Sequence, residues 1–124
     1  MPKARPKYLN LFQIRQPIPA IVSIMHRVSG AVLFLFLWII LWTLDRSLAS
    51  PESFAELKAT IDQPLVKLVL LALLWAYLHH TFAGIRHLVI DLHIGTALPK
   101  VRAMSMAALA LGLGLTLAVG VALW

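Results

Sequence analysis

Three long stretches without any Lys, Arg, Asp or Glu dominate this chain, and they constrain its fold more than any other feature. They cover residues 28–44, 68–85 and 103–124. A helix needs about 20 apolar residues to cross the hydrocarbon layer of a membrane, and each stretch approaches or exceeds that length once its flanks are included. Only 13% of the residues are charged, against roughly a quarter in soluble domains. We therefore predict an all-α membrane protein with three transmembrane helices near 20–45, 64–92 and 101–124.

Little chain remains for anything else, so residues 1–124 are expected to form a single transmembrane anchor domain. Residues 1–19 contain four prolines among basic and polar residues, which favours an extended tail. Between the first two spans, Ser50-Pro51-Glu52 has the order of an N-cap, a proline at the first helical position and an acid in the first turn. This order predicts a short interfacial helix.

The net charge of +6 is distributed at the span ends, which indicates membrane orientation and argues against nucleic-acid binding. The N-terminal flank has five basic residues and no acid: Lys3, Arg5, Lys7, Arg15 and Arg27. The second connection also has a basic excess, whereas the first mixes three bases with four acids. We therefore expect a cytoplasmic N-terminus and a periplasmic C-terminus. The sequence has no cysteine, so this chain ligates no iron–sulfur cluster through thiolates.

One face of the second predicted span carries an unusual set of ionisable residues. His80, Gly84, His87 and Asp91 recur at i, i+4, i+7 and i+11, which places them on one stripe of a helix. Ionisable side chains inside a span are costly and usually face a helix bundle or a bound group. A plain hydrogen bond from His80 to a neighbouring helix is the simplest alternative to a ligand site.

The depths of the two histidines suit a haem standing on edge. His80 lies within the hydrocarbon and would supply an axial imidazole, while His87 lies roughly 10 Å nearer the cytoplasm, where propionates would lie. Gly84 would leave space for the ring. His79 is an alternative ligand, but it points about 100° away from the stripe. His26 is expected to lie too shallow for the same iron, so the second axial ligand must come from a partner helix or a second copy.

The first predicted span opens with a second polar cluster. His26 and Arg27 are expected at the depth of His87, where they would contact haem propionates. Ser23 and Arg27 are four residues apart, so a hydroxyl and a guanidinium share a patch that can bind a carbonyl or carboxylate. The alternative is that Arg27 is an ordinary interfacial anchor. Asp91 is a candidate for an ion pair with Arg27 or Arg86, or for a proton relay.

Taken together, these motifs resemble the larger membrane-anchor subunit, the cytochrome b subunit, of bacterial succinate dehydrogenase (succinate:quinone oxidoreductase). The resemblance rests on Arg5-Pro6, on the motif SIMHRVSG at residues 23–30, and on His80-x-x-x-Gly84-Ile85-Arg86-His87 with Asp91. The length and the three-span arrangement agree over essentially the whole chain. Many relatives continue the Arg-Pro pair with Ser-Pro-His-Leu, whereas this chain has Lys7-Tyr8-Leu9-Asn10.

This resemblance implies a four-subunit respiratory complex of the tricarboxylic acid cycle in the bacterial inner membrane. A flavoprotein with FAD would oxidise succinate, an iron–sulfur subunit would relay electrons, and two anchor subunits would hold haem b between them. By the same resemblance, His80 corresponds to the axial ligand of the haem iron, and His26, Arg27 and His87 to propionate contacts. Ser23, Ile24 and Arg27 correspond to the ubiquinone site. No residue of this chain would contact succinate.

Three alternatives remain open at this stage. The chain could be the anchor of a related fumarate reductase, some of which lack haem. It could instead be a small assembly protein whose histidines only bond to neighbouring helices. It could also be a transporter or proton-channel subunit that uses His80, His87 and Asp91 as a relay.

Overall fold

The computed structural model of this chain is all-α over the residues that it describes, which are residue 10 and residues 13–124. Four helices follow one another in the order α1 (Ile18–Ala49), α2 (Pro51–Ile61), α3 (Pro64–Asp91) and α4 (Leu98–Leu123). Three of them, α1, α3 and α4, are long and apolar enough to cross a membrane. The predicted three spans and the short helix between the first two are confirmed. Most of the tail predicted for residues 1–19 lies outside the described residues.

The observed helices are slightly longer or shifted relative to the predicted spans. α1 begins at Ile18 with Pro19 in its first turn and continues to Ala49, four residues beyond the predicted end. Its 32 residues make a helix of about 48 Å, more than the ~30 Å hydrocarbon layer requires. α4 begins at Leu98, three residues early, with Pro99 in its first turn. Both helices thus continue beyond their apolar stretches into segments that carry charged residues.

The short helix α2 begins as its sequence predicts. Ser50 is the N-cap, and its hydroxyl oxygen accepts a hydrogen bond from the Ser53 N–H at 3.1 Å. The backbone N–H of Glu52, together with the Ser50 hydroxyl, holds the pKa of the exposed Glu52 carboxyl below its ordinary value. The Ser53 hydroxyl donates to the Arg46 carbonyl across the turn, at 2.7 Å, and Arg46 pairs with Glu56 at 3.5 Å. These bonds fasten α2 to the end of α1.

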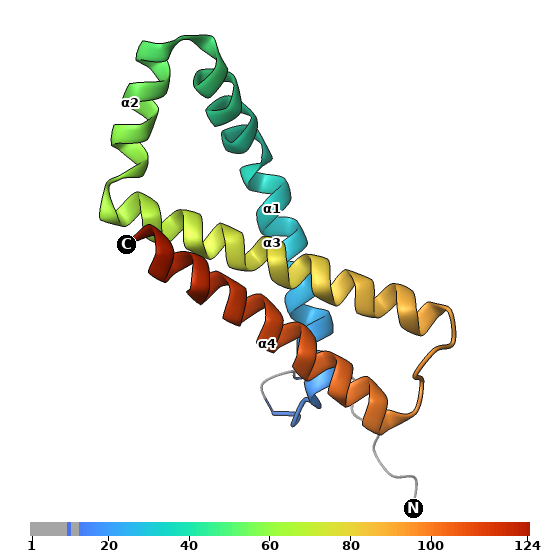
Figure 1. Cartoon of the computed structure of the whole chain (residues 1–124). Coiled ribbons are helices and arrows are strands. Elements are labelled where there is room, and N and C mark those ends of the chain that lie inside the picture. The colour runs from blue at the N-terminus through green and yellow to red at the C-terminus, as the bar shows by residue number, and fades with distance from the viewer. Residues whose placement is uncertain (1–9, 11–12) are drawn as a thin grey trace, which may run out of the picture.

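α3 and α4 lie side by side along most of their length, whereas α1 crosses α3 at an angle (Figure 1). The α3–α4 interface is built from small residues: Gly112 is buried, and a Cβ atom there would lie 3.4 Å from the backbone of His79. Small residues four apart let membrane helices approach closely. Gly112 and Gly120 of α4 therefore pack against α3 of the same chain, at His79 and Leu71 respectively.

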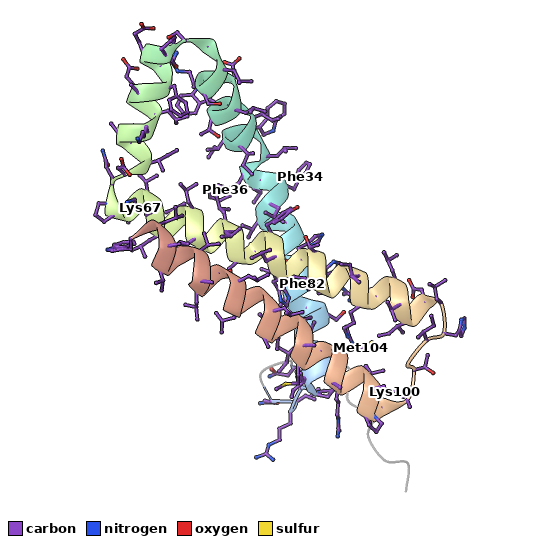
Figure 2. All side chains as sticks on the ribbon, in the orientation of Figure 1. Phe34, Phe36, Lys67, Phe82, Lys100 and Met104 are labelled. Carbon is purple, nitrogen blue, oxygen red and sulfur yellow. The ribbon has the colours of Figure 1, made fainter. Side chains whose placement is uncertain are left out.

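At the end of the α3–α4 pair that lies away from their connecting segment, the start of α3 meets the end of α4. The Lys67 ammonium donates to the Leu123 carbonyl at 3.3 Å and pairs with Asp62 at 3.4 Å. Figure 2 shows Lys67 at this end and Lys100 at the opposite end of the α3–α4 pair. Beyond its crossing with α3, α1 exposes large apolar side chains such as Phe34, Leu35 and Trp38, which are 71–77% exposed. A lipid bilayer or partner helices would cover such a surface.

Candidate functional site

The histidines of α1 and α3 meet where these two helices cross. The rings of His26 and His80 stack face to face, with centroids 4.1 Å apart and an interplanar angle of 9°. The His87 ring lies 5.1 Å from that of His26. The structure therefore brings His26, His80 and His87, three of the residues predicted to hold a haem, into one cluster. His26 was expected to lie too shallow to share an iron with His80, and the helix crossing instead brings the two rings to one level.

The position of His80 is fixed through one of its ring nitrogens. Its Nδ1 lies 3.0 Å from the backbone carbonyl oxygen of His26 and 3.3 Å from the Ser29 hydroxyl. A carbonyl oxygen only accepts, so Nδ1 carries the proton of this bond and the lone pair of a neutral ring remains on Nε2. The Ser29 hydroxyl donates to the same carbonyl at 2.9 Å. This is the arrangement of metal-binding histidines, whose second nitrogen is usually held by such a bond.

Two glycines make room for this cluster. A Cβ atom at Gly30 would lie 2.8 Å from Cε1 of His80, closer than real side chains approach. A Cβ atom at Gly84 would lie 3.4 Å from Nε2 of His26. Gly84 was predicted to leave space for a bound ring, and in this structure the atom facing it belongs to His26. Gly30 and Ser29 belong to the motif at residues 23–30, but neither was assigned a role from the sequence alone, although both follow His26 on its own face, at i+4 and i+3.

His79, the alternative ligand, lies in a different environment. Its side chain is completely buried, and its ring stacks on Trp75 with centroids 5.5 Å apart. Neither of its ring nitrogens has a hydrogen-bond partner in the described part of the chain, and Gly112 of α4 packs on its backbone. His79 therefore lies where α3 packs on α4, with its ring also close to the Val22 backbone of α1. His80 faces the part of α1 that contains His26 and Ser29.

The residues predicted to bind a quinone lie on α1, on both sides of His26. Ser23 is half-buried, while Ile24 and Arg27 are exposed at the surface of this chain. Ser23 and Arg27 share a helix face through their four-residue spacing. Because His26 lies between them in sequence, the patch and the histidine cluster are adjacent.

Asp91 does not form the ion pair that the sequence suggested. It is exposed at the last residue of α3, and the ion pairs among described side chains are Arg46–Glu56 and Lys67–Asp62. The reason is directional: Asp91 is five residues beyond Arg86, about 140° around the helix. Asp91 remains close enough to His87 for an electrostatic interaction.

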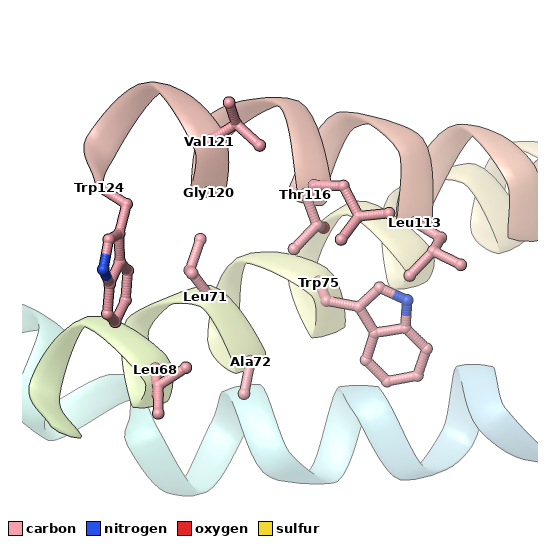
Figure 3. Close-up of a pocket in the computed structure, with 10 residues that line it drawn as sticks. Leu68, Leu71, Ala72, Trp75, Leu113, Thr116, Gly120, Val121 and Trp124 are labelled. Carbon is pink, nitrogen blue, oxygen red and sulfur yellow. The ribbon is translucent and has the colours of Figure 1, made fainter. Parts of the chain in front are cut away.

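An apolar groove lies between α3 and α4, away from the cluster of His26, His80 and His87. It measures about 500 Å³, and Figure 3 shows Leu71, Trp75, Leu113 and Trp124 among the side chains around it. Its lining is almost entirely apolar, with Thr116 as its one hydroxyl-bearing residue. The Thr116 hydroxyl donates to the Gly112 carbonyl of its own helix at 2.8 Å. Among the described residues, this groove offers no ionisable side chain for chemistry.

Comparison with known proteins agrees with the resemblance inferred from the motifs. Residues 1–119 match the family described as succinate dehydrogenase/fumarate reductase transmembrane subunit. This chain belongs to that family. The succinate dehydrogenase cytochrome b556 subunit of Coxiella burnetii is 37% identical over 121 residues, which are 97% of each chain. The subunit of the same name from Paracoccus denitrificans is 33% identical over 103 residues, 83% of this chain and 79% of the relative.

Membership in this family makes the chain a membrane subunit of a succinate dehydrogenase type of complex. Such a subunit works with the other subunits of its complex and with the lipid bilayer. The three apolar helices agree with a multi-pass membrane protein. The transporter and proton-channel alternatives are thereby set aside in favour of a respiratory membrane subunit.

Proposed function

We propose that this chain binds haem b through His80, forms part of a quinone site at Ser23 and Arg27, and helps electrons pass from an iron–sulfur subunit to ubiquinone. The observation that carries the haem proposal is the bond from His80 Nδ1 to the His26 carbonyl, which leaves Nε2 free for a metal. The cytochrome b556 name of the relatives supports a haem of the b type.

The surrounding residues fit such a group. The rings of His26 and His87 lie beside His80, and Arg27 follows His26 directly on α1, so ring and guanidinium donors for the propionates would be close at hand. His26 would not share a metal with His80, because the two rings stack face to face and do not direct their nitrogens at a common point between them. A second ligand to the haem iron would come from the second anchor subunit.

Haem b, when bound, supplies one-electron transfer chemistry. The residues of this chain supply position and charge. Ser23 and Arg27 would bind the carbonyl oxygens of the quinone headgroup, with Ile24 forming part of the apolar wall. The Arg27 guanidinium would stabilise the negative charge that develops on a quinone oxygen during reduction. Succinate oxidation, FAD and the iron–sulfur clusters would belong to the soluble partner subunits.

The charge distribution supports an orientation for this reaction. Four basic residues lie at the end of the bundle where α1 begins and where α3 is followed by α4: Arg27, Arg86, Lys100 and Arg102. By the positive-inside rule, this end faces the cytoplasm of a bacterial inner membrane. A soluble electron donor on that side would then lie close to Ser23 and Arg27.

The direct test is a reduced-minus-oxidised absorption spectrum of the complex purified in mild detergent. We expect a b-type band that His80→Gly removes and that added imidazole partly restores. The matched control is His79→Gln, which alters the neighbouring histidine and should keep the band. Equal loss of the band in both variants, or a wild-type complex without a band, would contradict the assignment of His80.

A further inference from the structure

Arg86 is the most unusual charged residue in this structure that the proposed haem and quinone sites do not use. Its side chain lies within the last two turns of α3 and is only 6% exposed. Its Nε and one of its terminal nitrogens are buried without a hydrogen-bond partner in the described residues. A guanidinium is always charged, and a buried charge requires a partner to offset its desolvation. Arg86 therefore calls for an anion.

No acid of this chain can serve as that anion. The sequence has five acidic residues, and four of them lie at or beside α2, at the opposite end of the bundle: Asp45, Glu52, Glu56 and Asp62. The fifth, Asp91, is exposed and points about 140° away from Arg86 around α3. Residues 1–12 include no Asp or Glu, so the N-terminal tail cannot supply the charge either. The counter-charge must come from another molecule.

A groove beside Arg86 indicates what kind of molecule this is. It measures about 190 Å³, lies between α3 and α4, and apart from Arg86 its lining is wholly apolar: Phe82, Ile85, Val89, Met104, Ala107, Ala108 and Leu111. Figure 2 shows Phe82 on α3 and Met104 on the facing part of α4. Its ligand must therefore combine an anion with an apolar chain.

The propionates of a haem on the proposed site do not meet this requirement. His87 faces His26 of α1, whereas the adjacent Arg86 is turned about 100° from it and lines the groove between α3 and α4. Lys100 and Arg102, both exposed in the first two turns of α4, add positive charge at the same end of the groove. Basic pockets between membrane helices on the cytoplasmic side suit anionic lipid headgroups.

We infer that Arg86 and this groove bind an anionic glycerophospholipid, with a phosphate oxygen on the guanidinium and part of one acyl chain along Phe82, Val89 and Leu111. The lipid would supply the charge that Arg86 lacks and cover the apolar flank of the α3–α4 pair. This site is independent of haem and quinone binding.

The test is to extract and quantify phospholipids from the whole complex purified in mild detergent. We expect the wild type to retain phosphatidylglycerol or another anionic phospholipid, and Arg86→Gln to retain roughly tenfold less, since a charge-assisted contact is lost. The matched control is Lys67→Gln, which removes a cation at the opposite end of α3 and should not change the lipid content. Equal anionic lipid in wild type and Arg86→Gln would overturn the inference.

A second measurement covers the case in which Arg86→Gln does not assemble. The delipidated wild-type complex should unfold at a higher temperature in phosphatidylglycerol vesicles than in phosphatidylcholine vesicles, and identical midpoints would overturn the inference. The main competing partner is a carboxylate of another subunit. Loss of the second anchor subunit from Arg86→Gln with unchanged anionic lipid would favour that partner and reject the lipid. An unchanged b-type band in Arg86→Gln would show that the haem site is intact.

Discussion

The edge of the His80 ring occupies the space that a side chain at Gly30 would need, with Cε1 only 2.8 Å from the position of a Cβ atom. The imidazole of His80 on α3 therefore packs directly against α1 at Gly30. The His80 ring is thus wedged between the backbone of α1 and the ring of His26.

Replacing Gly30 with Ala should therefore disturb the proposed haem site. The added methyl group would push the His80 ring away from the His26 carbonyl, and overpacking of this kind costs about 1–3 kcal/mol. We expect a weakened b-type band and a lower unfolding temperature for the complex. The control is Gly114→Ala, because a Cβ atom at Gly114 meets nothing within 4 Å. An unchanged band in Gly30→Ala would refute the fit between this glycine and His80.

Arg27→Ala should impair reduction of the quinone without affecting succinate oxidation. A hydrogen bond to a charged group contributes about 1.5–3 kcal/mol, so we expect quinone reduction to slow by roughly ten- to a hundredfold. A dye-linked succinate assay on the same complex should keep its rate. Arg46→Ala, at the far end of α1, is the control. Parallel loss of both activities in Arg27→Ala would indicate failed assembly instead of a damaged quinone site.

A bulky residue at Gly112 should separate α3 from α4. A Cβ atom there would already lie 3.4 Å from the His79 backbone, so the longer side chain of Gly112→Leu cannot fit without moving the helices apart. We expect a loss of about 1–3 kcal/mol or more, measured as a lower thermal midpoint of the complex. Gly114→Leu places the same side chain two residues away, where no neighbour stands. Similar midpoints for the two variants would contradict the interface described for α3 and α4.

The proposed orientation can be tested at the C-terminus. A reporter that is active only outside the cytoplasm should be active when fused after Trp124, because α4 would end on the periplasmic side. The same reporter inserted into the α3–α4 connection should be silent. The opposite pattern would reverse the orientation and place Ser23 and Arg27 away from a cytoplasmic electron donor.

The three spans and the short helix between them follow from the sequence for a local reason. A charge-free apolar stretch of sufficient length has one stable form in a bilayer, since a helix satisfies every backbone hydrogen bond within itself. The N-cap at Ser50 is equally local, because it depends on neighbours within four residues. The ends of α1 and α4 were less predictable, since charged residues there can continue a helix beyond the membrane.

Helical periodicity also placed His80 and His87 on one stripe, and the sequence by itself separated His79 from them. It could not determine which neighbour each face would meet. Periodicity sets the direction of a side chain about its own axis, whereas the neighbour depends on where two helices cross and how closely they approach. Only the tertiary structure shows that His26 stacks on His80 and that Gly30 gives space to the His80 imidazole. It also shows that Gly112 lies at the α3–α4 contact, and that Arg86 is buried whereas Asp91 is exposed.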